Sequence, residues 1–168
     1  MTNSILRQVL IFIVLVLAQI AIFSNINFLG YINPYPYLIF VLVFPIFENR
    51  SILIISAFLM GLSIDMFENS GGIHAASLLT IAYLRPFVLR SLFGTAYEYN
   101  QLKISSTSYA QRFTYVLILV VIHHFILFTL ETFALSDIIY ILKRTLFTTL
   151  FSVVLIFILL ILFTPDRK

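Results

Sequence analysis

Apolar runs about as long as a membrane-spanning helix alternate with short polar segments along the whole chain. A helix that crosses the hydrocarbon core of a bilayer needs about 20 consecutive, mostly apolar residues. The pattern therefore predicts six spanning helices, at about residues 5–23, 31–47, 51–67, 73–93, 113–135 and 140–163. Tight polar turns separate most of them, and the segment 94–112 is the long polar connection.

The second predicted span is the least regular, because prolines bound it at Pro34, Pro36 and Pro45. Proline suits the first turn of a helix and disrupts its interior. We expect this helix either to begin earlier, near Tyr31, or to be short and partly irregular. Irregular backbone at membrane depth must be buried in protein or line a cavity.

Composition excludes several classes of protein. The chain has 168 residues, of which 61% are hydrophobic and 10% charged, and its mean hydropathy is +1.08. A soluble domain is about 45–50% apolar and about 25% charged, so an ordinary soluble enzyme, a disordered chain and a nucleic-acid binder are excluded. Cysteine is absent, which excludes disulfides, thiolate zinc sites and thiol catalysis. We expect an all-α membrane protein with a single polytopic domain over residues 1–168.

The distribution of basic residues predicts the orientation. If the N-terminus is cytoplasmic, only Lys143 and Arg144 of the ten Lys and Arg residues fall on the outer side. Such a bias follows the positive-inside rule, and an even number of spans places both termini in the cytoplasm. The inner group comprises Arg7, Arg50, Arg85, Arg90, Lys103, Arg112, Arg167 and Lys168.

Charged residues near the outer ends of the predicted spans are the first candidates for a site, because polar groups at membrane depth are costly. They are Asp65, Glu131, Lys143 and Arg144. The interpretation we favour is one or two ion pairs that join helix ends. The alternative is a pocket for a substrate or partner that faces outward.

Two adjacent histidines lie in the middle of the fifth predicted span. His124 and Glu131 are seven residues apart and share one helical face, whereas His123 points elsewhere. A proton relay and a metal site are the alternatives, but the sequence contains no HExxH. We therefore favour buried histidines that are hydrogen-bonded to a neighbouring helix.

Arg85 precedes Pro86 near the inner end of the fourth predicted span. We expect its side chain to snorkel toward the inner surface, with partner binding as the alternative. The chain contains no GxSxG, Walker A or GxGxxG motif. We therefore expect a non-enzymatic protein, with no catalytic residues, metal site or cofactor.

The stretch from residue 57 to 75 reads AFLMGLSIDMFENSGGIHA and carries the most specific pattern. Gly61 permits close approach of another helix backbone, and Asp65 follows one turn later on the same face. We expect its carboxylate to accept backbone N–H groups at the start of the next span, where negative charge is favoured. Gly71 and Gly72 permit positive φ in the turn. The motif is either a clasp for a helical hairpin or a docking site for a partner, and the pattern does not choose between them.

This pattern, Gly-x-x-x-Asp followed by a short loop and Gly-x-His-Ala around His74, resembles the rod shape-determining protein MreD family. The resemblance extends to the chain length and the six-span layout. It implies a non-enzymatic, multi-pass scaffold of the bacterial inner (cytoplasmic) membrane that binds MreC. Through MreC it acts with a class B penicillin-binding protein, RodA and MreB in side-wall peptidoglycan synthesis and cell shape. The family is also similar in fold to the S-components of energy-coupling-factor transporters.

Two other functions stay open at this point. One is a small-molecule-binding transporter subunit of the S-component type. Its pocket would be lined by the face of His124 and Glu131, by the level of the bundle at which Asp65 and Arg144 lie, and by the irregular second span. A protein that binds or flips a lipid intermediate is the other, through Arg85, Arg90 and the 94–112 segment. Membrane lipids are expected partners in every case, and nucleic acid in none.

Overall fold

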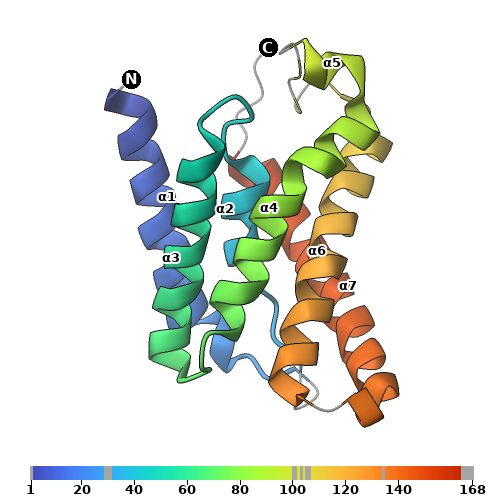
Figure 1. Ribbon diagram of the computed structural model, residues 1–168. Coiled ribbons are helices and arrows are strands. Elements are labelled where there is room, and N and C mark those ends of the chain that lie inside the picture. The colour runs from blue at the N-terminus through green and yellow to red at the C-terminus, as the bar shows by residue number, and fades with distance from the viewer. Residues whose placement is uncertain are drawn as a thin grey trace.

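The computed structural model describes residues 2–28, 32–99, 102, 104, 107–133 and 135–163. Within these ranges the chain is helical, apart from turns and one isolated bridge between Phe28 and Ile32. Its elements, drawn in Figure 1, are α1 (Thr2–Ala21), η1 (Phe23–Asn25), η2 (Pro36–Leu38), α2 (Ile39–Val43), α3 (Arg50–Glu68), α4 (Ile73–Phe93), α5 (Thr95–Glu98), α6 (Tyr109–Thr132), η4 (Leu135–Asp137) and α7 (Ile138–Phe163).

Five helices of the described chain are long and apolar enough to cross a membrane, which makes this a multi-pass membrane protein. The candidate spans are Ile5–Asn25, Arg50–Glu68, Ile73–Phe93, Tyr109–Thr132 and Ile138–Ile161. Each corresponds within a few residues to a predicted span, so the predictions at 5–23, 51–67, 73–93, 113–135 and 140–163 are confirmed.

The sixth prediction, a spanning helix at 31–47, is not confirmed, because the helices that the described residues of this stretch form are the short η2 and α2. Its prolines explain the short length. Tyr35 precedes Pro36 and has non-helical angles (φ −118°, ψ 74°), and Phe44 precedes Pro45 with ψ 138°. A proline disfavours the helical conformation of the residue before it, so the helix is bounded on both sides.

This short segment lies inside the bundle. Tyr37, Leu38 and Val41 are fully buried, and α2 lies behind α3 and α4 in Figure 1. The chain enters the segment at the lower end of that view, where α1 ends, and leaves it at the upper end, where α3 begins. The expectation that irregular backbone at membrane depth is buried in protein therefore holds here.

The helices alternate in direction, so that α1 begins and α7 ends at the upper end of the bundle (Figure 1). Arg7, Arg50, Arg90 and Arg112 occupy helix ends on that side. Lys103, Arg167 and Lys168, also assigned to the inner side, lie outside the described residues. The described basic residues thus gather at the upper end, while Lys143 and Arg144 lie near the lower start of α7.

α7 illustrates how the fold suits a lipid environment. Large apolar side chains at every fourth position are exposed, and hydroxyl side chains face the interior. This arrangement reverses that of a soluble protein, in which exposed positions are mostly polar. The exposed set is Leu142, Leu146, Leu150 and Val154, and the buried set is Thr145, Thr148, Thr149 and Ser152.

Candidate functional site

The carboxylate of Asp65, in the last turn of α3, caps the first turn of α4. Its Oδ1 accepts the backbone N–H of His74 at 3.0 Å, and its Oδ2 accepts that of Ala75 at 2.8 Å. Gly72 occupies the N-cap position of α4 and has no side chain to perform this role. The predicted hydrogen bonds are therefore present, and they satisfy two N–H groups that a helix start leaves unpaired.

Gly61 is the point of closest approach between α3 and α4. A Cβ at this position would lie 2.4 Å from the Cα of Ala75 and 2.6 Å from the carbonyl oxygen of His74. These are backbone atoms, so no side-chain movement relieves the contact. The close approach expected of Gly61 is observed, and it brings Asp65 within reach of the start of α4.

The turn between α3 and α4 needs left-handed backbone at three places. Asn69 ends α3 with φ 53°, and Gly71 and Gly72 follow with φ 71° and 97°. Glycine and asparagine adopt such angles most readily. Ser70 then donates its hydroxyl to Asp65 Oδ1 at 2.5 Å, so the turn is tied to the same carboxylate.

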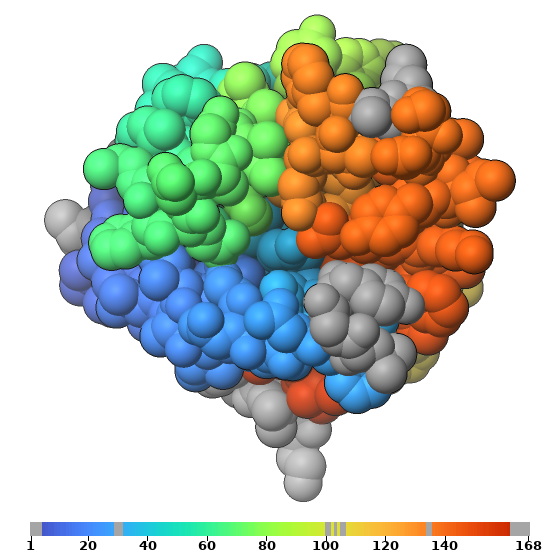
Figure 2. Space-filling view, turned by 90° about the horizontal axis from the view of Figure 1, so that it is seen from below, coloured from blue at the N-terminus to red at the C-terminus, as the bar shows by residue number. Residues whose placement is uncertain are grey.

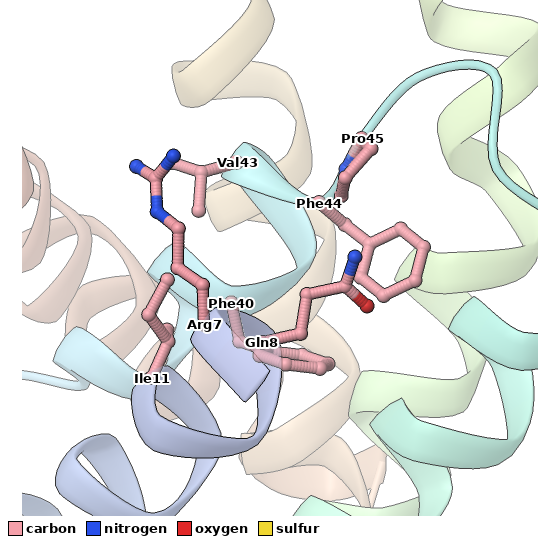
Figure 3. Close-up of a pocket in the computed structure, with 7 residues that line it drawn as sticks. All are labelled: Arg7, Gln8, Ile11, Phe40, Val43, Phe44 and Pro45. Carbon is pink, nitrogen blue, oxygen red and sulfur yellow. The ribbon is translucent and has the colours of Figure 1, made fainter. Parts of the chain in front are cut away.

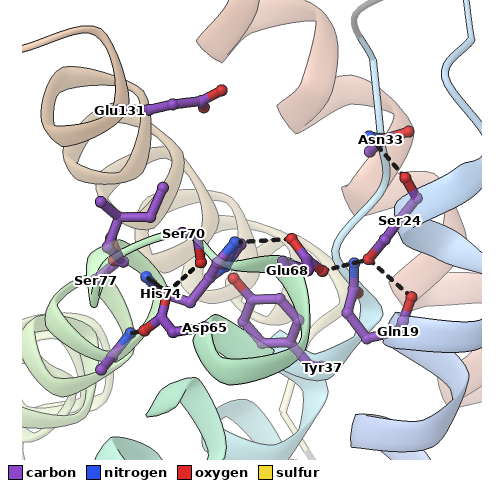
Figure 4. Close-up of polar contacts among 12 residues, drawn as sticks. Gln19, Ser24, Asn33, Tyr37, Asp65, Glu68, Ser70, His74, Ser77 and Glu131 are labelled. Atoms are coloured by element: carbon purple, nitrogen blue, oxygen red, sulfur yellow. Dashed lines mark hydrogen bonds and ion pairs between the residues drawn. The ribbon is translucent and has the colours of Figure 1, made fainter. Parts of the chain in front are cut away.

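Glu68 and His74 extend this network toward α1. The His74 Nε2 atom lies 3.2 Å from Glu68 Oε2, and the Ser24 hydroxyl donates to Glu68 Oε1. Ser24 in turn accepts a hydrogen bond from the Gln19 amide at 3.2 Å. Figure 4 shows these contacts side by side, with Asp65 and Ser70 on the other side of His74. The hairpin is thus anchored to the end of α1.

His123 and His124 are fully buried and bind different neighbours. His123 Nε2 shares a hydrogen bond of 3.0 Å with the Tyr37 hydroxyl, and His124 Nδ1 shares one of 3.0 Å with Thr149 of α7. The His124 bond confirms the prediction of a buried histidine bonded to a neighbouring helix, whereas His123 bonds to Tyr37 of the interior segment η2. Both residues fix the interior segment and α7 against α6.

The predicted outer charges form one ion pair rather than a joint cluster. Arg144 of α7 pairs with Glu131 of α6 at 2.8 Å. Asp65 binds the start of α4 instead, and Lys143 is exposed without an ion pair to any described residue. His124 and Glu131 share a face of α6, but His124 is buried and Glu131 is 38% exposed. Sharing one face of α6 therefore does not bring these two side chains into one site.

Arg85 turns inward, so the expectation that it snorkels to the surface was wrong. Its side chain is buried, and its Nη2 donates to the carbonyl oxygens of Phe44 at 2.5 Å and Leu42 at 3.5 Å. Its Nε donates to the Tyr115 hydroxyl at 2.8 Å, which donates to Leu42. The end of α2 leaves carbonyl groups unpaired at the negative end of its dipole, and a guanidinium satisfies several of them at once.

Replacing Arg85 with methionine is expected to lower the thermal stability of the protein in mild detergent. The buried carbonyl group of Phe44 would lose its donor, at a cost of about 1–3 kcal/mol for an unsatisfied group, and that of Leu42 would keep only the bond from the Tyr115 hydroxyl. Arg90→Met is the matched control, because Arg90 is exposed and its ion pair with Glu98 is at the surface. Equal melting temperatures for the two variants would contradict the role given to Arg85.

Comparisons with protein-family models, with curated proteins and with solved structures find no match for this chain. The site must therefore be interpreted from its own geometry. Among the described residues, no three His, Asp or Glu side chains are grouped so that they could hold a metal ion.

Sequence reasoning missed Glu68, Ser24 and Tyr37. No sequence pattern connects Glu68 with Ser24, which lies 44 positions earlier. Tyr37 reaches His123 across 86 positions. The lower end of the bundle is shown in Figure 2, where the α3–α4 hairpin in green and the α6–α7 end in orange lie side by side, next to the blue end of α1 and the segment that follows it.

Proposed function

We propose that this chain is a non-enzymatic scaffold of the bacterial cell-elongation complex, in the inner membrane with both termini in the cytoplasm. It binds an MreC-like membrane partner and, through that partner, acts with a class B penicillin-binding protein, RodA and MreB. The observation that carries the proposal is the α3–α4 hairpin, whose sequence resembles the MreD motif. There the Asp65 carboxylate holds the start of α4 and the turn before it against α3.

The arrangement of the motif residues supports a structural role for them. Both carboxylate oxygens of Asp65 are engaged with α4 and its turn. The space beside Gly61 is filled by the backbone of α4. His74 is buried against Glu68. A carboxylate that is buried and bonded through both oxygens, as that of Asp65 is, is a poor nucleophile or general base, but it helps to make a rigid platform for a partner.

We place the partner's helix on the exposed face of α3, the face that the other helices of the bundle do not cover. Exposed apolar residues recur on it at alternating spacings of three and four, the spacing with which two helices interlock. They are Ile52, Ile55, Leu59, Leu62 and Met66. Ser56 and Ser63 lie beside this row, and both hydroxyls bond to the carbonyls of their own helix. Small residues of this kind permit close packing between membrane helices.

Co-purification and cross-linking test the proposal together. Because the chain has no cysteine, a single cysteine at Leu62→Cys reports contacts of α3 without any background. We expect tagged protein in mild detergent to recover an MreC-like partner and Leu62→Cys to cross-link to it. The matched control is Leu146→Cys on the exposed face of α7, which should not cross-link. Recovery of no MreC-like partner would contradict the scaffold role, and cross-linking from α7 alone would contradict the assignment to α3.

Binding of a small molecule, as in a transporter subunit, is a second candidate supported by one observation. Gln19 Oε1, His74 Nδ1 and His123 Nδ1 are buried without a hydrogen-bond partner among the described residues. Buried polar atoms are usually paired, and a polar ligand is one way to pair them. Under this alternative the same purification recovers a transport partner with ATPases in place of an MreC-like protein.

A further inference from the structure

A lateral groove runs along α1 on the side that faces α2 and α7. Its larger part has a volume of about 530 Å³ and is lined by Ile11, Val14 and Ala18 of α1, Ile39 of α2 and Leu160 of α7. Apart from Arg7 at one end, the residues that line it are apolar. Only 11% of the α1 span is buried inside the protein, so this helix leaves the groove open toward the surrounding membrane.

The upper end of the groove is polar. A second cavity of about 360 Å³ adjoins the first, since Arg7, Ile11 and Val43 line both. Figure 3 shows Arg7 and Gln8 of α1 at this cavity, opposite Phe44 and Pro45. Among the described residues no carboxylate forms an ion pair with Arg7. One end of an apolar groove therefore presents a positive charge that has no counter-ion among the described residues.

We infer that this groove binds one anionic phospholipid of the surrounding membrane, with its phosphate at Arg7 and an acyl chain between α1 and α7. The distance supports this assignment: from Arg7 to Ala18 a helix rises roughly 17 Å, close to half of a hydrocarbon core of about 30 Å. That half is the depth of the single leaflet in which such a lipid resides. The headgroup then lies at the upper end of the bundle, where the described basic residues gather.

The size of the groove favours a lipid chain over a protein helix. Ligand pockets commonly measure about 300–1,000 Å³, and both parts of the groove fall in this range. A spanning helix is about 10–12 Å wide and about 30 Å long, several times this volume. The partner helix proposed above packs on the exposed face of α3, away from this groove. The lipid site therefore does not depend on the scaffold role.

The absence of tryptophan from the chain makes quenching by brominated lipids a direct test. Leu160→Trp places a reporter in the groove. Ile161→Trp is the control, because Ile161 is 73% exposed and only one residue further along α7. The proteins are reconstituted into phosphatidylcholine vesicles, with bromine carried on the chains of either phosphatidylglycerol or phosphatidylcholine.

We expect Leu160→Trp to favour brominated phosphatidylglycerol about fivefold, the effect of one basic side chain on an anionic lipid, and Ile161→Trp to show no preference. Adding Arg7→Gln should remove the preference, and Arg7→Lys should retain it. Because the reporter itself adds bulk, native mass spectrometry of the otherwise unaltered protein provides the second measurement: one phosphatidylglycerol should stay bound, and Arg7→Gln should lose it. Equal quenching by both lipids together with no retained lipid would overturn the inference, as would a preference that survives Arg7→Gln.

Discussion

Replacing Gly61 with leucine is expected to abolish the accumulation of folded protein. Any Cβ at this position meets the backbone of α4, with the nitrogen of Ala75 at 2.5 Å and its Cα at 2.4 Å. Helix α3 must then move away from α4, and the capping bonds from Asp65 to His74 and Ala75 break with it. Overpacking alone costs about 1–3 kcal/mol, and the lost capping adds to that cost. Size-exclusion chromatography of tagged protein in mild detergent measures the folded yield.

The control for added bulk on the same helix is Ser63→Leu. Ser63 lies two positions away, and its hydroxyl bonds only to the carbonyl of Leu59 in the preceding turn. This variant should fold normally, and by the proposed location of the partner it should weaken recovery of the partner. If Gly61→Leu gave the same folded yield as Ser63→Leu, the tight contact between α3 and α4 would not be needed for folding.

Replacing Asp65 with alanine is expected to give the second largest loss of stability. Two backbone N–H groups at the start of α4 lose a charged acceptor, and hydrogen bonds to charged groups contribute about 1.5–3 kcal/mol each. Asp65→Asn keeps one acceptor oxygen and should fall between the alanine variant and the unaltered protein. The melting temperature in detergent reports the overall loss, and hydrogen exchange of the His74 and Ala75 amides reports whether the first turn of α4 opens.

Asp137→Asn is the control for the loss of a carboxylate, because Asp137 lies in another turn at the same end of the bundle and is exposed. It should change the melting temperature little. Partner recovery separates the two roles that the sequence leaves open for Asp65. A clasp requires that stability and recovery fall together in Asp65→Ala. A fully stable variant that loses only the partner would make Asp65 a docking residue.

The parts of the site that the sequence predicts well are those built from neighbouring positions. Gly61, Asp65 and the start of α4 lie within about one helical hairpin, so their spacing along the chain determines which groups meet. Gly71 and Gly72 belong to the same turn, and their positive φ values follow from the same local constraint. The positions of the spanning helices could be predicted equally well, because the length and apolarity of a spanning helix are local properties of the sequence.

The parts that sequence reasoning missed depend on distant partners. Arg85 was predicted at the surface because the carbonyl groups it binds belong to Leu42 of α2 and to Phe44 just after it, more than 40 positions earlier, and no periodicity reveals them. The short interior segment was predicted as a possible irregularity from its prolines, but its burial depends on all the helices around it. The face shared by His124 and Glu131 was correct as geometry on one helix. The spacing of the two residues does not indicate how deeply each side chain is buried, because packing against α7 decides that.

The most direct test of the scaffold proposal is the shape of the host cell when this protein is depleted. The proposal predicts that rod-shaped cells become wide or round, that side-wall peptidoglycan incorporation falls, and that a copy of the unaltered gene restores both. Asp65→Ala supplied in the same way should fail to restore them, while Asp137→Asn should succeed. Depleted cells that keep their width and their rate of side-wall incorporation would contradict the account.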